Sequence, residues 1–249
     1  MCNNTLLFQS GITLRFIIVS IFQIWPVFYC SYFAYRLLKR AKNRSTYILS
    51  AYFATTSLTY FIATLSTYLN FFNLFEPLSY LIYVISIYFF VFSFSFLINF
   101  SRLLTKLDEK KCNTTFFLRV VLYAILSSFV IIIGILFNGI TLNASTDWIP
   151  VYSWFFLGFS WIYFLLFLII PQIYLSFKIL RVFEGIVLKR RLNRFIIATF
   201  LGLLVLVFLF LYNTWIENDI FRTVYIFIIP ELATIAAYLV YIGFGKELD

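Results

Sequence analysis

Histidine is absent from the 249-residue chain, and cysteine occurs only three times. Without imidazole, histidine-ligated metal sites and histidine proton relays are excluded. We expect Cys2 to lie outside the membrane, Cys30 within it and Cys112 on its cytoplasmic side. No disulfide framework is therefore predicted. The sequence also lacks the HExxH motif and paired membrane aspartates. We therefore expect no enzymatic activity, metal or cofactor.

Charged residues are scarce as well, at 12% of the chain, whereas 63% of the residues are hydrophobic and mean hydropathy is +0.97. A soluble domain of this length could not remove so much apolar surface from water. The apolar residues form long blocks rather than short alternating segments. This pattern predicts an all-α protein that crosses a lipid bilayer several times, and it argues against a transmembrane barrel.

Seven apolar blocks divide the chain, which we treat as a single domain over residues 1–249. Each block has about 20 to 25 residues, enough to cross a hydrocarbon core of about 30 Å at 1.5 Å per residue. The first follows Arg15, is too long for a signal-peptide core and is interpreted as a retained helix. The predicted seven-helix bundle covers residues 16–38, 46–70, 77–101, 116–140, 151–180, 195–216 and 223–244.

The net charge of +9 reflects how the basic residues alternate between the two sides of the membrane. The connections near residues 36–44, 102–119 and 178–194 hold roughly five or six Lys and Arg residues each, and those at 71–76 and 141–150 hold none. Basic loops stay in the cytoplasm, so we predict an outside N-terminus and an inside C-terminus, with the plasma membrane as the expected location. These loops suit a cytoplasmic partner, and nothing in the pattern indicates nucleic acid.

Glu231 is the one acidic residue deep within an apolar run, directly after Pro230. An intramembrane carboxyl is costly and marks a candidate functional site. Counting along the helices places Gln23, Asn138 and Asn213 at its level or nearer the outside, so these four residues form the predicted ligand-binding set. The alternative is structural: a protonated Glu231 that hydrogen-bonds a tyrosine or a backbone carbonyl between helices.

Pro26, Pro171 and Pro230 are the intramembrane prolines and the predicted hinges, because proline frees a backbone carbonyl one turn earlier. The segments PVFYCSYFAYR (26–36) and PQIYLSFKILR (171–181) match at Pro, Tyr, Ser and Arg. The match suggests two parallel triplets of helices joined by the fourth helix, a 3+1+3 repeat. A chance match in so aromatic a sequence is the alternative.

The segment PQIYLSFK, followed by Glu184-Gly185, resembles the signature of the PQ-loop and SWEET transporters. The resemblance implies seven helices, an outside N-terminus, a 3+1+3 repeat with Pro26 and Pro171 as hinges, and a small polar solute as substrate. It covers about 15 residues of the fifth helix. The first helix has Pro26-Val27 where that family has a second Pro-Gln.

The topology also resembles that of seven-helix receptors, although their residue motifs are mostly missing. Arg102 lacks an acidic neighbour, and the seventh helix has neither Asn-Pro-x-x-Tyr nor a mid-membrane lysine for retinal. The leading hypothesis is a receptor-like sensor that binds a small ligand in an outward-facing pocket and shifts its inner ends against a cytoplasmic partner. The alternatives are a transporter of small solutes and a lipid-interacting assembly subunit.

Overall fold

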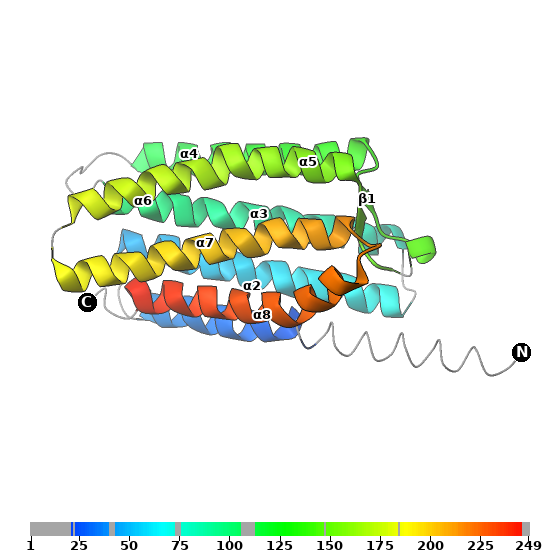
Figure 1. The fold of residues 1–249 in the computed structure, drawn as a ribbon, viewed down its shortest axis with the longest axis horizontal. Coiled ribbons are helices and arrows are strands. Elements are labelled where there is room, and N and C mark those ends of the chain that lie inside the picture. The colour runs from blue at the N-terminus through cyan, green and yellow to red at the C-terminus, as the bar shows by residue number, and fades with distance from the viewer. Residues whose placement is uncertain are drawn as a thin grey trace, which may run out of the picture.

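A bundle of long helices running back and forth makes up the protein (Figure 1). The computed structural model describes residues 21, 23–39, 43–72, 76–105, 113–146, 148–183 and 185–245. Within these ranges, six helices of 23 to 29 residues are long and apolar enough to cross a membrane. The prediction of a multi-pass helical membrane protein is thereby confirmed.

The helices follow one another with short connections. Residues 23–39 are helical, and α2 (Arg44–Phe71), α3 (Glu76–Leu104) and α4 (Asn113–Leu136) come next. A small hairpin of β1 (Ile140–Thr141) and β2 (Val151–Tyr152) encloses the short 3-10 helix η1 (Ala144–Thr146). The remaining elements are α5 (Trp154–Tyr163), the π-helical segment η2 (Phe164–Ile169), α6 (Ile170–Val182), α7 (Ile186–Thr214), α8 (Asp219–Val240) and a second π segment, η3 (Tyr241–Gly245).

The connections lie at two opposite ends of the bundle (Figure 1). One end carries β1 and β2, which pair antiparallel with Ile140 opposite Tyr152, and we call it the hairpin end. The other end, where α3 leads to α4 and α6 leads to α7, carries Arg102, Lys178 and Lys189, and we call it the basic end. Trp154 and Trp215, at the start of α5 and the end of α7, are exposed at the hairpin end, as expected of indoles at a membrane interface.

Polar N-caps start three of the helices. The side chain of Asn43 accepts hydrogen bonds from the backbone N–H and the hydroxyl of Thr46 at 2.8 and 2.7 Å. Ser153 and Asn218 accept from the backbone N–H three residues later, at 3.2 and 2.9 Å. Each cap satisfies an N–H group that the helix cannot pair, so the apolar runs begin at defined residues.

Several boundaries differ from the expected ones. The predicted span 116–140 ends at Leu136, since the chain reverses at Phe137–Gly139 to enter β1, and Val151–Tyr152 are a strand rather than the start of a helix. The predicted span 195–216 begins earlier, at Ile186. With 29 residues, α7 is about 44 Å long at 1.5 Å per residue and extends past a hydrocarbon core of about 30 Å. Its basic first turns therefore belong to the helix and not to a surface loop.

Small hydroxyl residues let α2 and α3 approach closely. Ser79, Ser86 and Ser93 recur every seven residues along α3 and are all buried. The Ser66 hydroxyl of α2 donates to the Ser79 carbonyl at 2.9 Å, and the Ser79 hydroxyl donates to the side chain of Asn70. Small side chains and interhelical hydrogen bonds hold helices together in lipid, where apolar burial gives no advantage.

Candidate functional site

Three elements meet through polar side chains at the hairpin end. The hydroxyls of Tyr83 on α3 and Tyr152 on β2 are 2.7 Å apart. The side chain of Asn213, near the end of α7, lies next to the Tyr152 hydroxyl. Tyr152 and Asn213 are both buried. The contacts fasten the hairpin to the bundle and form a buried polar centre there.

The hairpin and its aromatic neighbours fix the position of Tyr152. Its ring packs edge-on against Phe156 at 5.3 Å and lies 5.2 Å from the fully buried Phe210. Burial raises the pKa of the Tyr152 hydroxyl above its usual value. Tyr152 is therefore a neutral group at physiological pH that can both donate and accept a hydrogen bond.

Arg222, in the first turns of α8, extends the polar centre. Its guanidinium lies 5.0 Å from the centre of the Tyr212 ring, and Nη2 lies 3.5 Å from the Tyr212 hydroxyl. Tyr212 stacks on Tyr225 at 4.3 Å. Tyr212 and Tyr225 lie in the neighbourhood of Tyr83. We call the whole set the hairpin-end cluster: Tyr83, Tyr152, Tyr212, Asn213, Arg222 and Tyr225.

One polar atom of the cluster lacks a partner. The Nε atom of Arg222 is buried and makes no hydrogen bond to any residue that the structure describes. A buried donor left without an acceptor costs about 1–3 kcal/mol, and more when it is charged. A carboxylate, phosphate or carbonyl oxygen would satisfy this N–H, and the stacked tyrosines would flank a flat or apolar group. The cluster is thus suited to a small ligand with an acceptor oxygen.

The four residues predicted to bind ligand have different surroundings in the structure. Asn213 belongs to the hairpin-end cluster. Gln23 is half-buried and accepts a hydrogen bond from Thr67 on α2 at 3.1 Å. Asn138 is exposed in the turn after α4, with a φ of 48° that asparagine tolerates better than most residues.

Glu231 lies on α8, away from the cluster. It is nine residues beyond Arg222, about 13 Å along the helix axis at 1.5 Å per residue. Its position is near the middle of the apolar span Asp219–Gly243, and its side chain is exposed. Among the described residues the Glu231 side chain makes no hydrogen bond to Gln23, Asn138 or Asn213, and a ligand site shared by these residues stays a prediction.

Pro171 is the second residue after a widened stretch of helix. The π segment Phe164–Ile169 precedes it, and π turns accommodate a residue that cannot donate its N–H. The Phe167 carbonyl, one turn before the proline, accepts a hydrogen bond from the Tyr123 hydroxyl of α4 at 3.2 Å. The neighbouring Gln172 is fully buried and exchanges hydrogen bonds of 3.1 and 3.2 Å with Ser101 on α3. The Pro-Gln pair is thus tied to both adjacent helices.

The other two predicted hinges have different surroundings. Pro26 is buried within the first described helix. Pro230 lies inside α8, and its carbonyl accepts a hydrogen bond from the Thr234 hydroxyl at 3.0 Å. Hinge motion at these prolines remains a prediction.

A small central cavity lies deeper in the bundle. Its volume of about 20 Å³ admits about one water molecule. Tyr29, Tyr52, Thr56 and Tyr60 give it hydroxyl groups from residues 23–39 and α2, and Gly202 of α7 and Ala233 of α8 close it. It is far below the 300–1,000 Å³ of a usual ligand pocket.

Arg222, Tyr83 and Tyr152 were not among the ligand-binding residues predicted from the sequence. A usable signal existed for Arg222, which is the only Lys or Arg between residues 195 and 245 and lies on the side where the loops otherwise lack basic residues. No signal marked the two tyrosines, because the chain has 18 of them.

No protein-family model, curated protein or solved structure matches this chain.

Proposed function

We propose that this multi-pass membrane protein is a sensor that binds a small ligand at the hairpin-end cluster. In this proposal the bundle crosses the plasma membrane seven times, with the hairpin end outside and the basic end in the cytoplasm. Binding outside shifts the inner ends of the helices against a cytoplasmic partner at the basic loops. The protein catalyses no reaction.

The observation that carries the proposal is the buried Nε of Arg222 beside the stacked pair Tyr212 and Tyr225. The cluster joins α3, β2, α7 and α8. A ligand that bridges Arg222 and Tyr152 would therefore change the packing of several helices at once, which is what a sensor requires. The unpaired donor supports a ligand with a carboxylate or another anionic oxygen.

A second candidate is the transporter that the proline repeat suggests. The observation that favours it is the central cavity, because the cavity lies between the first three helices and the last two. Transporters built from repeats place their solute site between the repeats. In this interpretation the structure is a closed state, and the cavity enlarges when the helices move about Pro26 and Pro171.

Binding and flux assays on the purified protein in proteoliposomes test both functions. A panel of carboxylic acids, amino acids, sugars and cations is screened by thermal shift, and each hit is tested for uptake. A sensor binds a carboxylate without transporting it. Arg222→Gln should weaken binding at least about tenfold, because a charge-assisted hydrogen bond is lost.

Arg181→Gln is the matched control, since Arg181 is exposed at the basic end. It should leave binding unchanged. Binding that survives Arg222→Gln would contradict the assignment of the cluster, and uptake of the hit would favour the transporter. Glu231→Gln tests the remaining prediction for that residue: if Glu231 contributes to the site, binding or flux is lost while the protein stays folded.

A further inference from the structure

Glu231 lies on a face of α8 that points away from the rest of the bundle. It is the middle residue of the apolar span Asp219–Gly243. Phe227 and Ile235, one turn before and one turn after it, are 67% and 47% exposed. Six exposed residues spaced three or four positions apart form this face, which we call the outer stripe of α8: Ile220, Val224, Phe227, Glu231, Ile235 and Tyr238.

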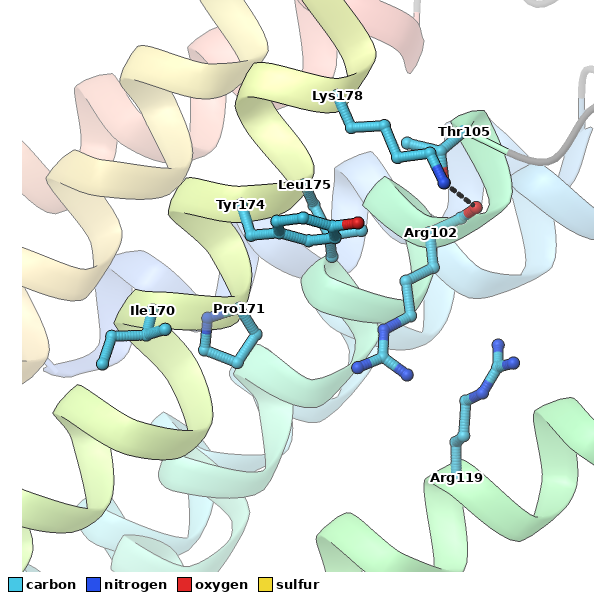
Figure 2. A pocket seen from close by; sticks show the side chains of 8 residues that line it. All are labelled: Arg102, Thr105, Arg119, Ile170, Pro171, Tyr174, Leu175 and Lys178. Atoms are coloured by element: carbon cyan, nitrogen blue, oxygen red, sulfur yellow. Dashed lines mark hydrogen bonds between the residues drawn. The ribbon is translucent and has the colours of Figure 1, made fainter.

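Two cavities in the described part of the bundle both exclude Glu231. The cavity at the basic end, of about 390 Å³, is lined by side chains of α3, α4 and α6 and by none of α8 (Figure 2). The small central cavity is lined on α8 by Ala233, Ala236 and Ala237. At 3.6 residues per turn these alanines are on the opposite side of the helix from Glu231. The carboxyl group therefore points toward lipid and not into either cavity.

A carboxyl group in this position needs a polar partner. The middle of a hydrocarbon core of about 30 Å is about 15 Å from either surface, too far for a glutamate side chain to reach water. Exposure to lipid there costs at least a few kcal/mol. No hydrogen bond or ion pair joins Glu231 to another residue that the structure describes. The Lys and Arg residues outside the described ranges precede the first predicted span, follow the last or fall in predicted connections.

A second copy of this chain supplies that partner without any other protein. Two α8 helices that pack by their outer stripes about a two-fold axis bring Glu231 opposite Glu231. A protonated carboxyl group donates one hydrogen bond and accepts others, so two facing carboxyl groups satisfy each other. A single polar residue in an apolar helix seam also fixes the register of the two helices. The side chains of Phe227 and Ile235 fill the grooves on either side of the pair.

We propose that the protein forms a two-fold symmetric dimer in the membrane through the outer stripe of α8, with the two Glu231 carboxyl groups hydrogen-bonded at its centre. The interface is separate from the hairpin-end cluster. Arg222 precedes Glu231 by nine residues, which is about two and a half turns, so the two side chains leave opposite sides of α8. The dimer therefore does not depend on the function assigned to the cluster.

Cysteine cross-linking of the purified protein in phosphatidylcholine proteoliposomes tests the dimer. Ile235→Cys in the outer stripe and Ile125→Cys on α4 are introduced separately into a chain whose Cys2, Cys30 and Cys112 are replaced by alanine. Ile125 is the more exposed of the two, at 61% against 47%, so chance collisions alone would favour it. With copper phenanthroline as oxidant, Ile235→Cys should cross-link at least about tenfold faster than Ile125→Cys, because the dimer holds its thiols close together.

Two changes at Glu231 test the part played by its carboxyl group in the Ile235→Cys chain. Glu231→Leu removes the polar pair and should slow cross-linking at least about fivefold, whereas Glu231→Gln should retain it, because an amide also donates and accepts. Equal rates for Ile235→Cys and Ile125→Cys, no effect of Glu231→Leu, or equal losses in both Glu231 variants would each overturn the proposal. Light scattering of the unmodified protein in detergent adds a measurement without any variant: two copies are expected, and a monomer would contradict the dimer.

Discussion

The hydroxyl groups of Tyr83 and Tyr152 lie 2.7 Å apart, although 69 positions separate them in the sequence. This contact joins the first turns of α3 to a hairpin whose two strands have only two residues each. Such short strands have little stability of their own. The tyrosine pair and the aromatic packing around Phe210 therefore hold the hairpin in place over the candidate site.

A double-mutant cycle measures this contact. Tyr83→Phe and Tyr152→Phe should each lower the free energy of unfolding by about 0.5–1.5 kcal/mol, because each removes one partner of a buried hydrogen bond. The double variant should lose less than the sum of the two. Tyr47→Phe, at an exposed tyrosine of α2, serves as the control and should have no effect. Strictly additive losses in thermal unfolding would show that the two hydroxyls do not interact.

Tyr123 is predicted to stabilise the region around Pro171. Tyr123→Phe removes the hydroxyl that donates to the Phe167 carbonyl and should cost about 1–3 kcal/mol, since Pro171, four residues later, has no N–H to replace that donor. Hydrogen exchange should also accelerate in the amides of α6 next to the π segment. Tyr238→Phe, at an exposed tyrosine of α8, is the comparison and should leave exchange in α6 unaltered. Unchanged exchange in Tyr123→Phe would mean that Pro171 needs no support from α4.

Gly139 should tolerate no side chain. A Cβ atom at this position would lie 2.7 Å from the Cβ atom of Phe156, whose place is fixed by its own backbone. Gly139→Ala should thus destabilise the hairpin end by about 1–3 kcal/mol through overpacking. Gly158→Ala on α5 meets no atom within 4 Å and should cause no loss. Equal melting temperatures for the two variants would show that the turn after α4 can shift to make room.

The length of the apolar runs predicted an all-helical membrane protein. In lipid the backbone N–H and C=O groups must hydrogen-bond within each segment, so a run of about 20 apolar residues has few alternatives to a helix. The ends of α3 and α6 that carry Arg102 and Lys178 lie at the same end of the bundle, whereas the side of the membrane that each end faces stays a prediction. The hairpin was missed since its strands are too short to show an alternating pattern. The π segment before Pro171 was missed because a proline within an apolar run is compatible with several helix distortions.

The rotation of each helix was harder to predict than its depth. Counting residues placed Glu231 near mid-span, but α8 is apolar around most of its circumference. A helix of this kind carries no clear stripe to show which face meets its neighbours. The exposed position of Glu231 and the buried position of Asn213 are therefore properties of the packed bundle. Arg222 was overlooked for a related reason: it was treated as part of a loop, although it lies inside α8.

Cysteine labelling in intact cells tests most directly whether the hairpin end faces outside. Ser145→Cys, in the hairpin, and Lys189→Cys, at the basic end, are introduced separately into a chain whose Cys2, Cys30 and Cys112 are replaced by alanine. Both positions are exposed. A membrane-impermeant maleimide should label Ser145→Cys in intact cells and Lys189→Cys only after permeabilisation. The reverse pattern, or labelling of both positions in intact cells, would contradict the account.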